Sequence, residues 1–288
     1  MVETIRSYAD LAKYKLSAAV TLSTVTGYFL SGNQIDNTIF IVAAGVFFLS
    51  SGSASMNQYT EREADSIMNR TSKRPLPAMR ITGKNALLAS LLFFMAGSIL
   101  LLINGLIPFL LGVFNVFLYN VIYTRLKRIT PLSIIPGSLV GAIPPLIGFA
   151  ASGSSFPNTG IIGFSLFMFL WQLPHFWLII IKYGDEYNAA GFATITKYLN
   201  DKQIRNLIFL WVLFSSCLIF LFFIISEIPG KALPGLFLIL NVTFILLFHR
   251  LLFARKYEGQ IKGAFILINS FSLIIMFLFI VASLLNFI

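Results

Sequence analysis

The stretch that decides the fold is FIVAAGVFFLSSGSASMNQYTEREADSIMNRTSKRPLP, residues 40–77. Its first half is almost entirely apolar and, with the residues before it, reaches the roughly 20 residues that a membrane-spanning helix needs. Its second half is polar, and Pro75 and Pro77 prevent the helix from continuing. The stretch therefore predicts a transmembrane helix whose polar end emerges at one membrane surface.

The rest of the chain has the same character. Of its 288 residues, 57% are hydrophobic and 11% are charged, against about 45–50% and about 25% in soluble globular proteins. This composition excludes a water-soluble domain, and the apolar runs lack the alternation of β-barrel strands. We predict an all-α polytopic membrane protein, a single domain over residues 1–288, with nine transmembrane helices in one bundle. The predicted spans are residues 14–31, 38–57, 85–103, 107–123, 132–151, 160–181, 206–226, 232–249 and 263–286.

The basic residues predict the orientation of the chain. With nine spans, 20 of the 21 Lys and Arg residues fall on one side of the membrane and only Lys231 falls on the other. By the positive-inside rule the N-terminus is cytoplasmic and the C-terminus is external. Topology thus explains the net charge of +10 without a nucleic-acid partner. Residues 1–13 are a short cytoplasmic segment without the features of a cleavable signal peptide, which favours a bacterial plasma (inner) membrane.

Three oxygen-bearing side chains mark the polar end of the second span. Asn57, Glu61 and Asp65 recur every four residues, so on a helix they form a slowly winding stripe on one face. Amide and carboxylate oxygens without His or Cys suit a hard cation, above all Mg²⁺. The alternative is a helix end in water, where such residues are ordinary.

Charged groups near other helix ends favour the metal site. Arg70 and Arg74 follow the stripe, and Arg binds phosphate in a bidentate manner. A second acidic pair, Asp185 and Glu186, follows the sixth span and is expected on the same face, which predicts a metal-bridged diphosphate site opening to the cytoplasm. The predicted diphosphate-binding residues are Arg70, Arg74, Lys127, Arg128 and Lys182. The predicted metal ligands are Asn57, Glu61, Asp65, Asp185 and Glu186, of which all but Glu186 are predicted catalytic residues.

Several segments resemble a known family. The spacing Asn57-x3-Glu61-x3-Asp65 followed by NRTSKRPLP resembles the first signature of the intramembrane aromatic prenyltransferases typified by 4-hydroxybenzoate polyprenyltransferase. The segments YTRLKRITPLSIIPGSLVGAIPPLIGFAA (123–151), FLWQLPHFW (169–177) and KYGDEYNAAG (182–191) resemble the protoheme IX farnesyltransferase (heme O synthase) branch. Glu61 departs from the family pattern, which has Asp there, but it keeps the charge.

The resemblance implies a specific reaction. A farnesyl group would pass from farnesyl diphosphate to a vinyl group of heme b, giving heme O for terminal oxidase assembly, with Mg²⁺ assisting departure of the diphosphate. Heme b would be a substrate rather than a cofactor. Heme A synthase or terminal oxidase assembly proteins are the protein partners implied by this role.

Alternative functions remain open from the sequence. The acceptor could be a quinone precursor or another aromatic ring, and a non-enzymatic heme-handling protein would share the apolar bundle. A transporter is disfavoured, because the acidic residues cluster at one interface rather than at paired broken helices near the midplane. His175 lies within the sixth span, where ionisable residues usually have a function. It is therefore a candidate heme-binding residue, and a neutral His hydrogen-bonded between helices is the equal alternative.

Overall fold

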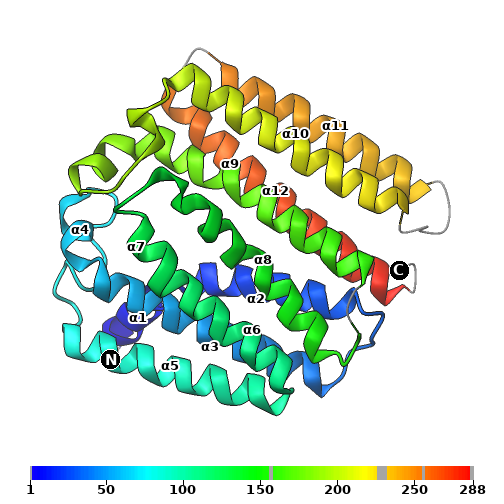
Figure 1. Ribbon diagram of the computed structural model, residues 1–288, viewed down its shortest axis with the longest axis horizontal. Helices are drawn as coiled ribbons and strands as arrows, with labels where there is room; N and C mark the ends of the chain where they lie inside the picture. Colours follow the sequence, from blue (N-terminus) through cyan, green and yellow to red (C-terminus); the bar gives the residue numbers. More distant parts are fainter. Residues whose placement is uncertain (1, 156–157, 226–231, 255–256, 286–288) are drawn as a thin grey trace.

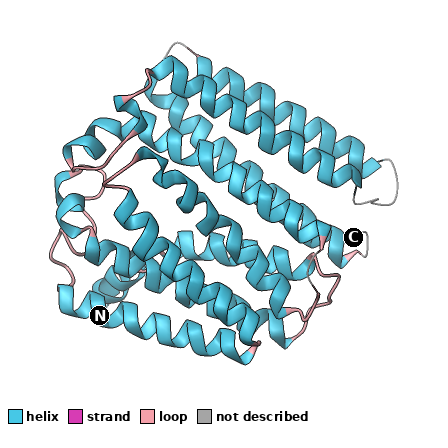
Figure 2. Ribbon diagram, viewed as in Figure 1, coloured by secondary structure: helices cyan, strands magenta, loops and turns pink. Residues whose placement is uncertain are grey.

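The computed structural model describes residues 2–155, 158–225, 232–254 and 257–285. In these ranges the chain forms helices joined by short turns, with no strand (Figure 2), which confirms the all-α prediction. The helices are α1 (Val2–Leu11), α2 (Tyr14–Phe29), α3 (Asn37–Thr60), α4 (Arg62–Ile67), α5 (Gly83–Ile103), α6 (Leu106–Phe117), α7 (Thr124–Leu126), α8 (Ile134–Ala151), α9 (Thr159–Ala189), α10 (Asp201–Ile225), α11 (Ala232–Phe253) and α12 (Tyr257–Leu284). Shorter turns are the π-helix η1 (Leu118–Tyr123) and the 3-10 helices η2 (Pro131–Ser133) and η3 (Ile195–Lys197).

Eight helical segments in the described part of the chain are long and apolar enough to cross a membrane. They correspond to the second through ninth predicted spans, with ends shifted by several residues. The first predicted span, residues 14–31, is the 16-residue helix α2. At 1.5 Å per residue α2 is about 24 Å long, shorter than the roughly 30 Å hydrocarbon core of a bilayer. Length and composition thus support eight spans, one fewer than predicted.

The outer surface of the bundle is apolar. Helices α5 and α11 lie at opposite edges of the molecule (Figure 1). Leu92, Met95 and Ile99 of α5 and Ile239 and Leu246 of α11 are exposed. A soluble monomer rarely exposes so much contiguous apolar surface, and lipid tails would cover it. The chain is therefore a multi-pass membrane protein.

The first and last long helices meet and complete the bundle. A Cβ atom added to Gly148 would lie 1.9 Å from the carbonyl oxygen of Thr24, so α8 and α2 touch through their backbones. Such close approach requires small residues at the crossing. Helix α12 packs against both α2 and α9, and the hydroxyl of Ser283 donates a hydrogen bond to the carbonyl of Phe29 at 2.6 Å. These contacts enclose the space between α2, α3, α8, α9 and α12.

Several backbone irregularities lie at the end of the bundle that holds α4, α7 and the N-terminus (Figure 1). Glu61 separates α3 from α4, and Tyr183 has non-helical torsion angles (φ −127°, ψ 16°) inside α9. Lys13, between α1 and α2, is left-handed, with φ 45°. Lys13 and Glu61, at two of these interruptions, line the same cavity.

Candidate active site

A cavity of about 630 Å³ lies inside the bundle. This is within the usual range of small-molecule sites, about 300–1,000 Å³. Its charged end lies at the turns around α4 and α7, whereas its deeper wall is apolar and includes Leu49, Val116, Ile147, Met168 and Met276. The cavity can therefore hold a ligand with an anionic head and a hydrocarbon body.

The predicted stripe lines the charged end of this cavity. Asn57, Glu61 and Asp65 all line it and are 3%, 6% and 0% exposed. The amide of Glu61 donates to the carbonyl of Asn57 at 2.9 Å, and that of Asp65 to Glu61 at 2.8 Å. These bonds continue the helical pattern across the junction between α3 and α4, which keeps the three side chains on one wall. Two carboxylates buried so deeply need charged or hydrogen-bonding partners.

Basic residues from two other segments supply those partners. Nη1 of Arg74, in the loop after α4, lies 2.7 Å from both carboxylate oxygens of Asp65. Lys127, just after α7, forms an ion pair with Glu61. Both carboxylates are thus paired, and these four predicted residues form one cluster.

The end of α9 reaches the same cluster because the helix breaks at Tyr183. The backbone amide of Arg70 donates to Oε2 of Glu186 at 3.2 Å, and Nη2 of Arg70 donates to the hydroxyl of Tyr187 at 2.6 Å. The Arg70 guanidinium also lies over the rings of Tyr183 and Tyr187, 5.3 and 5.5 Å from their centroids. These contacts place Glu186, rather than the exposed Asp185, against the loop that carries Arg70.

The predicted residues divide into two groups. Asn57, Glu61, Asp65, Arg70, Arg74, Lys127 and His175 line the cavity, whereas Arg128, Lys182, Asp185 and Glu186 do not. Arg128 and Lys182 are exposed and lie over the rings of Phe192 and Tyr183. Within the described ranges, no three Asp, Glu, His or Cys side chains are close enough to share a metal ion.

The donor set of the stripe nevertheless fits Mg²⁺. Asn57, Glu61 and Asp65 offer one amide and two carboxylates on a single cavity wall, the oxygen ligands that Mg²⁺ prefers. In the described part of the chain, the buried amide nitrogen of Asn57 has no hydrogen-bond partner. This nitrogen is a hydrogen-bond donor, so it would serve an anionic oxygen, whereas Oδ1 of Asn57 is the atom that could bind Mg²⁺.

A π-helical turn orients two tyrosines into the cavity. Such turns often occur at functional sites, and η1 spans Leu118–Tyr123. The rings of Tyr119 and Tyr123 stack with centroids 5.6 Å apart, and Nζ of Lys127 lies 4.9 Å from the Tyr123 centroid. The two rings therefore form an aromatic part of the cavity wall beside Lys127.

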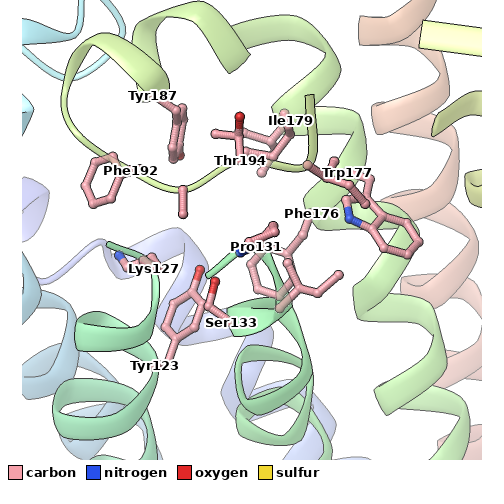
Figure 3. Close-up of a pocket in the computed structure, with 14 residues that line it drawn as sticks. Tyr123, Lys127, Pro131, Ser133, Phe176, Trp177, Ile179, Tyr187, Phe192 and Thr194 are labelled. Carbon is pink, nitrogen blue, oxygen red and sulfur yellow. The ribbon is translucent and has the colours of Figure 1, made fainter. Parts of the chain in front are cut away.

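A smaller recess of about 100 Å³ adjoins the cavity (Figure 3). Tyr123, Lys127, Phe176, Tyr187 and Phe192 line both spaces. Figure 3 shows the segment that carries Phe192 and Thr194 passing over the recess opposite Tyr123. The amide of Ala193 fixes this segment by donating to the carbonyl of Lys127 at 2.8 Å. The loop after α9 therefore forms part of the cavity wall.

Lys13 is a cavity-lining cation that the sequence did not single out as a site residue. Burial lowers its pKa from 10.5 to about 7; Arg74 and Lys127 add to this effect, and Glu61 and Asp65 oppose it. In the sequence Lys13 is one of many basic residues at the cytoplasmic side. The local sequence does not show that the Lys13 side chain lines the cavity, because this depends on the corner between α1 and α2.

His175 lies among aromatic rings at the deeper part of the cavity. Its ring centroid is 5.1 Å from that of Trp171 and 4.8 Å from that of Phe265. Its Nδ1 atom has no hydrogen-bond partner in the described ranges. The His175 side chain also hydrogen-bonds Asn269 of α12, which is the contact between helices that the alternative prediction describes.

The chain is similar to known proteins over most of its length. The sequence model of the UbiA prenyltransferase family matches residues 20–285. The chain is 32% identical over 281 residues to the protoheme IX farnesyltransferase of Cytophaga hutchinsonii, covering 93% of each chain. It is 33% identical over 250 residues to that of Christiangramia forsetii, covering 85% of this chain and 79% of the relative.

Solved structures share the fold. The structure resembles a digeranylgeranylglyceryl phosphate synthase with a TM-score of 0.76 and 18% identity, covering 98% of this chain and 99% of the other. A UbiA homologue from Archaeoglobus fulgidus bound to GPP and Mg²⁺ gives a TM-score of 0.72 at 14% identity, covering 95% and 99%. At these identities the likeness concerns the arrangement of the helices.

Proposed function

Because the chain belongs to the UbiA prenyltransferase family, we propose that it transfers the farnesyl group of farnesyl diphosphate to a vinyl group of heme b. The protoheme IX farnesyltransferases that it matches over most of its length support this choice of donor and acceptor. The observation that carries the proposal is the single cavity of about 630 Å³, charged at one end and apolar beyond it. Its two ends match the diphosphate and the hydrocarbon of a prenyl diphosphate.

The paired charges provide a way to accept the diphosphate. Without ligand, Arg74 neutralises Asp65 and Lys127 neutralises Glu61. With metal and diphosphate bound, the two carboxylates would hold the metal and the two cations would contact phosphate oxygens. Each of these four side chains would then keep a partner of opposite charge, which avoids the large penalty for an isolated buried charge.

Magnesium is the cofactor proposed for this site, with Asn57, Glu61 and Asp65 as its ligands; Asp185 and Glu186, the further ligands predicted from the sequence, lie outside this cavity wall and would have to move to reach the metal. The UbiA homologue bound to GPP and Mg²⁺ is consistent with that choice. Bound Mg²⁺ would act as a Lewis acid that neutralises the leaving group. Arg70, Arg74 and Lys127 hold the diphosphate from the cavity side. Arg128 and Lys182 would act from the rim, where they attract the anionic substrate.

The apolar part of the cavity is where the farnesyl group would be transferred. The bond between farnesyl C1 and the diphosphate oxygen breaks, and diphosphate leaves with the electron pair. Farnesyl C1 then bonds to the terminal vinyl carbon, water adds to the inner vinyl carbon, and one proton is released. Tyr119 and Tyr123 present π-faces that can stabilise the allylic cation, and the apolar wall limits premature attack by water.

His175 is the proposed heme contact, because it lines the cavity away from the diphosphate end. The competing acceptor is a quinone precursor or other aromatic ring.

The test of the proposed function offers the protein both heme b and an aromatic acid as acceptors, together with labelled farnesyl diphosphate. We expect the label on heme b, and label on an added aromatic acid alone would favour the alternative.

We further propose that the end of the bundle bearing α4, α7 and the N-terminus faces the cytoplasm of a bacterial cell, that α2 is a ninth span, and that the C-terminus is external. The division of the basic residues supports this orientation. The product would then be available to heme A synthase or to terminal oxidase assembly proteins at the same membrane.

Cysteine labelling of intact cells tests this orientation. Lys231, which the sequence places outside, lies beyond the described residues, so Ser155, an exposed residue after α8, represents that side. In a Cys217→Ser background, a membrane-impermeant reagent is expected to label Ser155→Cys and to spare Lys84→Cys. The reverse pattern would show that the protein is oriented the other way.

A further inference from the structure

The corner between α1 and α2 holds a lysine in a conformation that L-residues seldom adopt. Lys13 has φ 45° and ψ 51°, in the left-handed region that glycine occupies without steric strain. Non-glycine residues persist in such a conformation only where the surroundings fix them, and they gather at functional sites. The surroundings of Lys13 and the direction of its side chain are therefore informative.

A side chain of helix α3, the helix that carries Asn57, holds this corner in place. Gln58, which is fully buried and adjacent to Asn57, donates from Nε2 to the carbonyls of Asp10 at 3.1 Å and Leu11 at 2.8 Å. The hydroxyl of Ser17 donates to the carbonyl of Ala12 at 3.0 Å. One glutamine thus ties the corner to the helix that carries the acidic stripe.

Helix α1 is also held by the loop before α5. Nη1 of Arg80, in the loop before α5, lies 3.3 Å from Oδ2 of Asp10 and 3.4 Å from the hydroxyl of Ser7. Leu11 is fully buried and packs with Leu76 and Ile81 from the same loop. The loop that presents Arg74 and the corner that presents Lys13 are therefore parts of one packed unit.

The Lys13 side chain lines the charged end of the cavity. Both carboxylates there are already paired, Asp65 with Arg74 and Glu61 with Lys127. Among the described residues, Lys13 forms no ion pair or side-chain hydrogen bond. The ammonium group has three donors and no acceptor, so an anionic ligand in the cavity is a suitable partner for this half-buried side chain.

We propose that Lys13 binds the diphosphate of the prenyl donor directly, and that Gln58 is the positioning residue that holds it toward the cavity. This inference rests on the proposed function, since it assigns a further contact to the same diphosphate. The other proposed partners of the phosphate oxygens are Arg70 and Arg74, in the loop after α4, and Lys127, just after α7. Lys13 therefore supplies the contact from the α2 side and encloses the leaving group.

The first test measures binding of inorganic pyrophosphate with Mg²⁺ to the purified full-length protein by calorimetry. Lys13→Met removes the charge but keeps a long side chain, and Lys84→Met removes an exposed cation on the loop side of α5 as the matched control. A charge-assisted hydrogen bond contributes about 1.5–3 kcal/mol, so Lys13→Met should weaken binding about 10- to 100-fold. Lys84→Met should bind like the wild type, and the affinity for heme b should be unchanged in both.

A second variant controls for misfolding of Lys13→Met. Lys13→Gly removes the same ammonium but is compatible with the left-handed backbone, so it should fold and show the same loss of pyrophosphate affinity. Gln58→Met should weaken pyrophosphate binding without removing a charge. If Gln58 acts through Lys13, the double variant should bind no more weakly than Lys13→Met, because coupled residues are not additive.

The outcomes separate this inference from the proposed function. Wild-type protein that fails to bind magnesium pyrophosphate would contradict the proposed diphosphate site itself. Wild-type protein that binds it, together with folded Lys13→Met and Lys13→Gly that bind it equally well, would overturn the role of Lys13. Additive losses in the double variant would remove Gln58 as its positioning residue.

Discussion

Excess EDTA is expected to abolish farnesyl transfer, and added Mg²⁺ to restore it. Glu61 and Asp65 line the same end of the cavity as the cations that would bind the diphosphate. Without a divalent cation these carboxylates would repel the leaving group, and their pairs with Lys127 and Arg74 would keep those cations engaged. Metal therefore contributes both neutralisation of the leaving group and release of the protein cations.

The measurement is product formed per hour by the same protein before chelation, after chelation and after readdition of Mg²⁺. Heme binding, measured by absorbance in each sample, is the control and should not change. Undiminished turnover in excess chelator would contradict the metal-dependent mechanism.

Asp65→Ala is expected to lower turnover by about 10²–10³, the usual effect of removing one preorganised charge-stabilising group. The carboxylate is fully buried and is paired with Arg74, so the substitution would remove a proposed metal ligand and disturb a proposed phosphate-binding cation together. Heme retention should be nearly unchanged, because His175, the proposed heme contact, lies deeper in the cavity. Glu61→Asp should be much milder, since it preserves the charge.

Two comparisons make this result interpretable. Glu63→Ala removes an exposed carboxylate from the same short helix, α4, and should turn over like the wild type. Asp65→Asn keeps hydrogen bonding to Arg74 and separates loss of charge from loss of folding. Wild-type activity in folded Asp65→Ala would exclude Asp65 from the reaction. Joint loss of heme binding and turnover would instead assign the stripe to the fold or to heme.

The features that could be predicted from the sequence are those set by local composition. Long apolar runs located eight spans, and the four-residue spacing of Asn57, Glu61 and Asp65 placed all three on one buried wall. The predicted first span ends two residues beyond helix α2, which ends at Phe29 and is followed by Ser31 and the left-handed Gly32, with φ 81°. Composition locates apolar segments less precisely than the backbone conformation ends a helix.

The features that could not be predicted depend on tertiary contacts. The break at Tyr183 changes the direction of the acidic pair, so Glu186 reaches Arg70 while Asp185 is exposed. The π-helical turn at Leu118–Tyr123 and the left-handed Lys13 are backbone choices without a distinctive local sequence. Each of them changes which side chain reaches the cavity, and this limited the prediction of the site more than that of the fold.

The most direct test of the account is the mass of the heme recovered after purified protein is incubated with heme b, farnesyl diphosphate and Mg²⁺. The account predicts heme that has gained one farnesyl group and one hydroxyl group, with release of one equivalent of diphosphate. Recovery of unmodified heme b from folded protein that binds both substrates would contradict it.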